Sequence, residues 1–306
     1  RARWYNVAGN PNREEPHMQQ RKLGRTGLAT SVLSFGCGAV GGLMTKGDPA
    51  DQERAVARAL DMGINYFDTA SIYGSGTSEQ NLGRVWARLM PKAAVGTKFR
   101  LKDPDYARIG AAVRTSLEES LKRLGLPSVD LLQLHNRIGT ATGGDVISPS
   151  HVLGEVVPAL QKARQDGLIR HFGITALGET GPLNEVVSSG AFDTAQVCYN
   201  ALNPTSGASL GSGYPAQDYA GLLGAAGKAG MGTIGIRILA GGALSGSELA
   251  QRLLGDFVDR VLGGAVTPLV AYLNHSQGLK ADEVAQLKRL VAELERQQRE
   301  DKPCRF

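Results

Sequence analysis

The sequence predicts an α/β fold, a single (β/α)8 TIM barrel with a shortened part after its seventh strand. From residue 32 onward, short apolar runs alternate with amphipathic helical patterns through seven or eight units. Such alternation is typical of βαβ units and a parallel sheet. The composition is uniform, 42% apolar and 21% charged over 306 residues, which favours one large barrel. A doubly wound sheet would need GxGxxG opening a helix, and residues 35–41 only loosely imitate that motif.

The first unit shows the pattern most clearly. Asp48 is expected to accept free N–H groups at the start of a helix, and Pro49 suits the first helical position. Gly63 ends this helix, and residues 64–67 then predict a strand. The residues expected on the buried face are Ala55, Val56, Ala59, Leu60 and Met62.

The same alternation continues along the chain. Further helices are predicted from Ser78, over residues 109–124, up to Gly167, from Pro182 and up to Gly230. Further strands are predicted over residues 93–95, 129–134, 169–174, 194–197 and 233–239.

The two ends of the chain are less regular. After residue 246 the pattern predicts a helix over 247–264, the eighth strand over 266–273 and a last helix over 281–295. Residues 1–17 are polar and have no helical or strand period. We therefore interpret residues 1–17 as an extension and residues 18–306 as the barrel domain.

Composition excludes several other classes of protein. The net charge of +5 comes from scattered Lys and Arg residues, whereas a nucleic-acid surface usually shows clustered ones. No run reaches the roughly 20 apolar residues of a membrane span. Cys37, Cys198 and Cys304 are far apart and lack metal-ligand spacing. We expect a cytoplasmic protein with reduced thiols, no metal, and no nucleic-acid or membrane partner.

Four polar residues lie at or just after predicted strand ends: Asp68, Tyr73, Lys98 and His135. Catalytic groups of (β/α)8 barrels lie at the carboxyl ends of the strands. Each residue alone has a structural alternative, as a loop cap, a packed ring, a surface charge or a core histidine. Together, in successive units, they predict a site for proton transfer.

The chemistry of this set is coherent. Tyrosine has a pKa of about 10, and a neighbouring lysine ammonium lowers it. Asp68 would keep Lys98 charged and in place, and a histidine can orient a carbonyl group. None of these side chains can carry a hydride, so the reaction requires a cofactor.

The motifs resemble the aldo-keto reductase family. The likeness lies in residues 22–28 (Lys-Leu-Gly-Arg-Thr-Gly-Leu), 65–70 (Asn-Tyr-Phe-Asp-Thr-Ala), 96–98 (Gly-Thr-Lys) and 132–135 (Leu-Gln-Leu-His), and it covers about residues 21–246. It implies a barrel that binds NADP(H), or NAD(H), without a metal. By this resemblance, Tyr73 would be the general acid/base. Lys98 and Asp68 would tune the pKa of Tyr73, and His135 would orient the carbonyl.

The same resemblance assigns binding residues. Gln196 matches a glutamine that bonds the nicotinamide carboxamide, and residues 239–244 resemble a loop around the pyrophosphate. The expected cofactor contacts are Gly38, Ala39, Asp68, Gln196, Arg237, Leu239, Gly241 and Leu244. The expected substrate contacts are Tyr73, His135 and Asn136.

The chain departs from the family pattern at three places. Residues 173–177 read Gly-Ile-Thr-Ala-Leu where members usually have Ser-Asn. Arg237 lies where many members stack an aromatic ring on the nicotinamide, and its planar guanidinium offers a substitute. The candidates for an adenosine grip are only Asn274, His275, Ser276 and Lys280.

These observations predict an NADP(H)-dependent oxidoreductase acting on an aldehyde, a ketone or a sugar lactol. The alternative is a cofactor-binding regulatory barrel with little turnover, which the altered cofactor contacts favour and the complete set of four polar residues opposes. A barrel isomerase or lyase would need a phosphate grip or a metal, and the sequence shows neither.

Overall fold

The computed structural model describes residues 18–38, 40–211, 213–242 and 244. They fall into two compact units, each described by itself. Within the described ranges, the first comprises residues 18–199, 205–211 and 218–236 without residue 39, and the second comprises residues 200–204, 213–217, 237–242 and 244. The predicted elements at 247–264, 266–273 and 281–295, and the extension at 1–17, lie outside the described residues. One domain over 18–306 stays a prediction.

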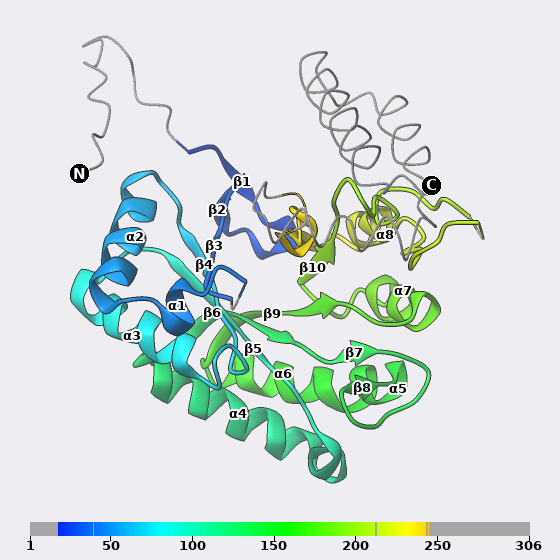
Figure 1. Ribbon diagram of the computed structural model, residues 1–306. Helices are drawn as coiled ribbons and strands as arrows, with labels where there is room; N and C mark the ends of the chain where they lie inside the picture. The colour runs from blue at the N-terminus through cyan, green and yellow to red at the C-terminus, as the bar shows by residue number, and fades with distance from the viewer. Residues whose placement is uncertain (1–17, 39, 212, 243, 245–306) are drawn as a thin grey trace, which may run out of the picture. The chain divides into compact units, whose positions relative to one another are not determined.

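Seven parallel strands of the first unit pair side by side in chain order (Figure 1). This is the order of a (β/α)8 barrel, in which each strand pairs with the strand of the next unit. The strands are β3 (Phe35–Gly36), β4 (Tyr66–Asp68), β5 (Ala94–Phe99), β6 (Val129–Leu134), β9 (Ile169–Ala176), β10 (Thr194–Cys198) and β11 (Gly232–Ile236).

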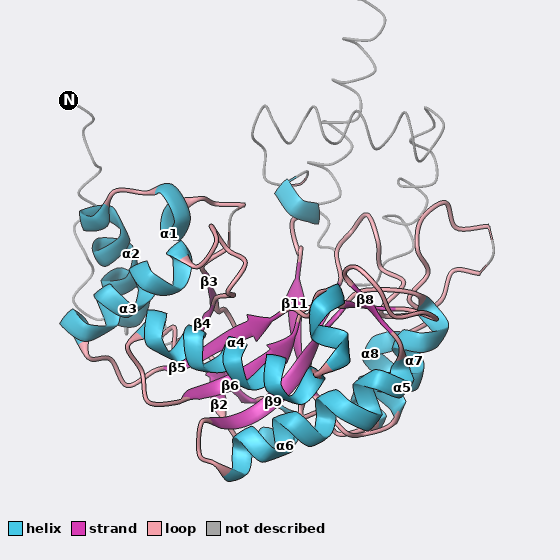
Figure 2. Cartoon of the chain, turned by 90° about the horizontal axis from the view of Figure 1, so that it is seen from below, coloured by secondary structure: helices cyan, strands magenta, loops and turns pink. Residues whose placement is uncertain are grey.

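Helices follow these strands, and α4 and α6 lie along one face of the sheet (Figure 2). The α-helices are α1 (Leu43–Lys46), α2 (Pro49–Asp61), α3 (Thr77–Leu89), α4 (Ile109–Leu124), α5 (Pro149–His151), α6 (Val157–Gln165), α7 (Thr180–Ser188) and α8 (Leu222–Lys228). A π-helical turn, Val152–Val156, joins α5 to α6, and short 3-10 segments span Gly24–Thr26, Asp103–Ala107 and Ala240–Gly242.

Local chemistry explains where the helices begin and end. The Asp48 side chain accepts hydrogen bonds from the backbone N–H groups of Ala50 and Asp51, so the predicted start of α2 is confirmed. Met62 was expected on the buried face but is 49% exposed, because it caps the helix beyond its last turn. The apolar stripe of α4 is buried as predicted, and Gly125 ends the helix in the left-handed region.

Five predicted strands have different bounds in the structure. Two of them are only extended at the end, β9 to Ala176 and β10 to Cys198. The strand expected at 64–67 begins two residues later, as β4. The strand expected at 93–95 continues to Phe99, so Lys98 lies inside β5. The strand expected at 233–239 stops at Ile236, because Arg237 has a φ of 53° and cannot continue an extended backbone.

Two small pairs of strands add to the main sheet. Near the N-terminus β1 (Gln20–Lys22) pairs antiparallel with β2 (Ala29–Ser31). After β6, β7 (Arg137–Ile138) pairs parallel with β8 (Val146–Ile147). Among the described residues, no helix is long and apolar enough to cross a membrane.

Candidate active site

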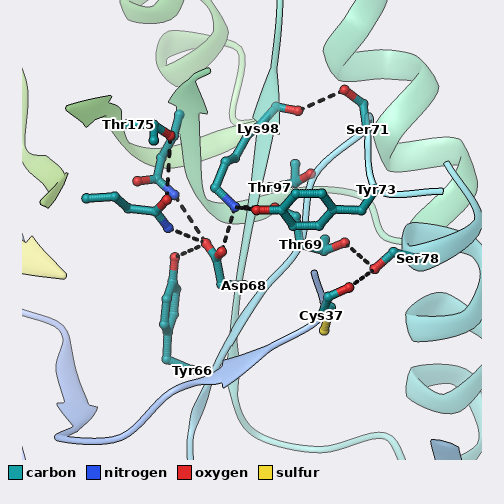
Figure 3. A network of polar contacts seen from close by, with 12 residues as sticks. Cys37, Tyr66, Asp68, Thr69, Ser71, Tyr73, Ser78, Thr97, Lys98 and Thr175 are labelled. Atoms are coloured by element: carbon teal, nitrogen blue, oxygen red, sulfur yellow. Dashed lines mark hydrogen bonds and ion pairs between the residues drawn. The ribbon is translucent and has the colours of Figure 1, made fainter. Parts of the chain in front are cut away.

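The carboxyl ends of β4, β5 and β6 bring the four predicted polar residues together. Figure 3 shows three of them, Asp68, Tyr73 and Lys98. Asp68 ends β4, Tyr73 lies in the turn that follows, and Lys98 is the penultimate residue of β5. His135 comes directly after β6, where its backbone N–H donates to Phe99 O at 2.9 Å. Parallel strands in register expose these ends at one edge of the sheet.

Lys98 is the centre of the cluster. Its side chain is fully buried, and Nζ donates to Asp68 Oδ2 at 2.5 Å, to Thr69 O at 2.8 Å and to the Tyr73 hydroxyl at 3.2 Å. Burial alone would lower the pKa of Lys98, but the Asp68 carboxylate and the Tyr73 phenol outweigh it and the pKa is raised. The residue is therefore a buried, charged ammonium that touches the phenolic oxygen.

Asp68 is held by donors from three other side chains. Its Oδ1 accepts from Gln196 Nε2 at 2.7 Å, from Gln133 Nε2 at 3.3 Å and from the Tyr66 hydroxyl at 3.4 Å. Burial, together with the nearby Asp68 charge, raises the pKa of Tyr66 well above 10, so Tyr66 stays a neutral donor. Such donors stabilise the carboxylate and fix its orientation toward Lys98.

Gln133 and Tyr66 were not among the predicted residues. Two signals in the sequence point to them. Gln133 is an amide between the apolar residues Leu132 and Leu134 of β6, and Tyr66 lies two residues before Asp68, on the same side of β4. Gly96 makes room for this arrangement, because a Cβ at that position would lie 2.1 Å from the Tyr66 hydroxyl oxygen.

The Tyr73 ring faces His135 on one side. The two rings meet edge to face, with centroids 6.0 Å apart and an interplanar angle of 85°. Gly38, one of the predicted cofactor contacts, lies beside the same ring: an added Cβ would be 3.6 Å from two ring atoms of Tyr73. Ala39, predicted with it, lies outside the described residues.

Gln196 and Thr175 continue the cluster along the ends of β9 and β10. Both are buried, and Thr175 Oγ1 lies 3.5 Å from Gln196 Oε1 at the limit of a hydrogen bond. The Gln196 amide that was predicted to bond the nicotinamide carboxamide thus contacts Asp68 and Thr175 in this structure. Thr175 lies in the segment that departs from the Ser-Asn pattern, and its hydroxyl places a polar atom there.

Residues 32–294 match the model of the aldo/keto reductase family. The chain belongs to the aldo/keto reductase family. The resemblance predicted from the motifs is therefore confirmed.

Two curated relatives align with part of the chain. It is 35% identical over 163 residues to L-galactose dehydrogenase of Arabidopsis thaliana, covering 52% of this chain and 49% of the relative. It is 32% identical over 190 residues to pyridoxal 4-dehydrogenase of Microbacterium luteolum, covering 51% and 55%. The chain thus spans about half the length of these relatives.

Solved structures of the family share the fold. The aldo-keto reductase from Klebsiella pneumoniae in complex with NADPH superposes with a TM-score of 0.57 at 21% identity, covering 89% of this chain and 95% of that chain. The likeness shows the (β/α)8 TIM-barrel fold predicted from the alternating pattern. Seven strands of that fold lie in the described part of the chain.

Asn136 occupies a different position from the one expected for a substrate contact. Its side chain is 0% exposed; Nδ2 donates to Leu101 O at 2.9 Å, while Oδ1 accepts from Leu101 N at 2.9 Å. Nδ2 also lies 3.3 Å from the Tyr106 hydroxyl and from Asp145 O. Asn136 therefore joins two loops of the aldo/keto reductase fold and exposes no atom to a substrate.

The Asn136→Ala variant tests this interpretation. Removing several buried hydrogen bonds and stranding their backbone partners should lower the free energy of unfolding by about 2–4 kcal/mol. Urea denaturation measures the loss, with exposed Arg137→Ala as a control for a substitution next to it. A folded variant with normal stability and a strongly raised KM would instead restore the substrate-contact interpretation.

The remaining predicted cofactor residues of this family member belong to the second unit. Arg237 and Leu239 are exposed, and Gly241 has a φ of 72°. Within this unit Ala240 N donates to Arg237 O at 2.7 Å and Leu244 N donates to Leu239 O at 3.1 Å, which forms a tight turn. The four adenosine-grip candidates at residues 274–280 lie outside the described residues. In the described part of the chain, no group of three or more His, Cys, Asp or Glu side chains is arranged to hold a metal ion.

Proposed function

We propose that this chain is an NADP(H)-dependent oxidoreductase that transfers hydride between nicotinamide and an aldehyde, a ketone or a sugar lactol. The observation that carries the proposal is the buried Lys98 ammonium, which donates to the Asp68 carboxylate and to the Tyr73 hydroxyl at once. A proton donor with a fixed cation beside it suits the reduction of a carbonyl group. The names of the two relatives, a galactose and a pyridoxal dehydrogenase, agree with such a substrate class.

The chemistry assigned to the chain's own residues is proton transfer. Tyr73 gives its hydroxyl proton to the carbonyl oxygen as that oxygen gains negative charge. Lys98, 3.2 Å away, stabilises the charge left on the phenolic oxygen, and Asp68 keeps Lys98 protonated and in place. His135, across the ring from Tyr73, orients the carbonyl.

The residues present fit a nicotinamide cofactor. The cluster holds a proton donor but no group that can supply hydride, which a nicotinamide supplies when bound. Because Gly38 has no side chain, the space beside the Tyr73 ring stays open there. Gln196 and Thr175 provide an amide and a hydroxyl group at neighbouring strand ends. The tight turn at residues 239–244, with its left-handed Gly241, remains the proposed pyrophosphate contact.

A regulatory barrel that binds cofactor with little turnover is the second candidate. One observation favours it: Gln196 Nε2, the donor expected for the carboxamide, is engaged by Asp68 at 2.7 Å. A Gln196 held in this way would leave the nicotinamide less firmly fixed.

A titration with NADPH and NADH, followed by turnover on a panel of carbonyl compounds, separates the two candidates. Saturable cofactor binding with reduction of at least one carbonyl class is the expected result. Cofactor binding without turnover on any of them would favour the regulatory barrel. Failure to bind either cofactor would overturn both.

The same titration tests a weak preference for NADPH. A 2′-phosphate is recognised mainly through bidentate arginine contacts, and Lys280 is the nearest cation after the predicted strand 266–273. Without such an arginine, we expect the dissociation constant for NADPH to be about 10 to 100 times higher than in a site with an arginine on the 2′-phosphate. Fluorescence titration at two salt concentrations measures it. Tight, strongly salt-dependent NADPH binding with a large preference over NADH would contradict the expectation.

A further inference from the structure

A cavity of about 620 Å³ opens in the first unit beside the loop that carries Tyr73. Ser71, Ile72 and Ser75 of that loop line one side of it. The segment that leads from β5 to α4, and one side of α4 from its first turn to its last, line the rest. Its walls therefore include residues that flank both Tyr73 and Lys98 in the sequence, although neither side chain lines it.

The charges around the cavity are unbalanced. Four cations face two carboxylates, which leaves two net positive charges. The charged lining residues are Arg100, Lys102, Asp105, Arg108, Glu119 and Arg123.

Both carboxylates are already engaged. Arg123 contacts Glu119 at 3.8 Å and also holds the buried Glu79 at 2.6 Å. Asp105 Oδ2 accepts the backbone N–H of Lys102 at 2.9 Å, where it caps the 3-10 turn Asp103–Ala107. Neither carboxylate forms an ion pair with Arg100, Lys102 or Arg108 among the described residues, and the net positive charge of the lining stays at two.

Three cations of the cavity form no ion pair. No carboxylate of the described residues lies within ion-pair distance of Arg100, Lys102 or Arg108. Arg100 Nε is buried and has no hydrogen-bond partner in the described part of the chain, while one of its terminal nitrogens lies 3.5 Å from His135 O. A buried guanidinium N–H without an acceptor is costly, so an acceptor from a ligand would stabilise it.

The start of α4 adds to the positive potential. Arg108 occupies the N-cap without capping through its side chain, and the first turn holds no acidic residue. Ala111 and Ala112 line the cavity, so this turn faces it. The helix is 16 residues long, and the free N–H groups at the start of such a helix favour an anion.

We infer that this cavity binds the anionic group, a phosphate or a carboxylate, of a small molecule. Arg100, Lys102 and Arg108 supply the charge-assisted hydrogen bonds, and Ser71 and Ser75 provide further polar contacts. The anion has two possible sources: the acidic end of the carbonyl substrate, or a separate anion bound next to the catalytic loop. The first source rests on the proposed function, and the second does not.

Calorimetric titration of the full chain with inorganic phosphate tests the site itself. Lys102→Gln combined with Arg108→Gln should weaken binding by about ten-fold or more, because each lost charge-assisted bond contributes on that order. Lys122→Gln removes an exposed cation of α4 outside the cavity and is the matched control. All three residues are exposed, and thermal unfolding checks that each variant is folded. The proposal is overturned if phosphate does not bind the wild type, or if the double variant binds it as the control does.

Kinetics with a matched pair of aldehydes then identifies the source. Succinic semialdehyde and its methyl ester differ in the terminal charge. For a substrate's acidic end, the double variant raises KM for the acid about ten-fold or more, keeps its kcat, and leaves the ester unchanged. For a separate anion, phosphate binding is lost while both aldehydes react as in the wild type. If the wild type binds phosphate but reduces no carbonyl compound, the proposed function fails and the anion site stands.

Discussion

The Tyr73→Phe variant should lose carbonyl reduction by a factor of about 10²–10⁴, the usual contribution of a general acid. Phenylalanine fills the same space beside Gly38 and His135 but has no proton to give. Lys98 loses one acceptor and keeps Asp68 and the Thr69 carbonyl, so the cluster should stay folded. We expect cofactor affinity to change little.

Single-turnover reduction of a reactive aldehyde under saturating NADPH measures this loss directly. Tyr106→Phe is the matched control, because its hydroxyl contacts Gly144 O, Val146 O and Asn136 and forms no hydrogen bond with Asp68, Tyr73 or Lys98. The control should retain the wild-type rate within a few-fold. A Tyr73→Phe rate within a few-fold of the wild type would remove Tyr73 from the mechanism.

The positions of the site residues could be predicted because parallel strands carry their ends to one edge. To apply this rule, one needs to know only the order of strands and helices along the chain. The alternating apolar runs of the sequence indicate that order. It places Asp68 and His135 at strand ends even though the predicted starts of the strands were in error by up to two residues. It also placed Lys98 near the edge, although β5 proved longer than the apolar run alone suggested.

The role of Asn136 could not be predicted by adjacency to His135. Both residues follow the end of β6, and Asn136 lies in a bend, so its side chain need not point the same way as that of His135. Asn136 turns to the Leu101 backbone. The buried amide of Gln133, two residues before His135, is the one that enters the cluster.

The cationic cavity was likewise invisible in the sequence. In the sequence, the positive charges of this stretch look scattered. Only the structure shows that Arg100, Lys102 and Arg108 line the same cavity. The turn Asp103–Ala107 brings the end of β5 and the start of α4 to one cavity. The carboxylates that line the cavity have other contacts: Asp105 accepts a backbone N–H, and Glu119 contacts Arg123. The sequence does not show which charged side chains form ion pairs and which do not.

Lys98→Met and Asp68→Asn should each lower the reduction rate strongly, and their combined effect should be smaller than the product of the two. Both residues act through the same phenolic oxygen. Once one of them is substituted, the second substitution therefore lowers the rate by a smaller factor. Removing one partner of a buried ion pair is also expected to cost about 3–5 kcal/mol of stability. The loss should be smaller for Lys98→Met, because the remaining carboxylate is 14% exposed and keeps its amide and phenol donors.

The pH dependence of the Asp68→Asn variant separates this coupling from a general structural loss. In the wild type the pKa of Lys98 is raised, so the ammonium persists above pH 9. Without the Asp68 charge, burial is the largest remaining influence and lowers that pKa, so Lys98 should lose its proton as the pH rises. The variant's rate relative to wild type should therefore fall as the pH rises, at pH values below the one at which the wild type loses activity. In the double-mutant cycle the exposed pair Arg54–Asp51 of α2 is the control, and its two substitutions should leave the rate within a few-fold. Independent, multiplicative losses at Lys98 and Asp68, or a pH-independent Asp68→Asn defect, would contradict a single coupled site.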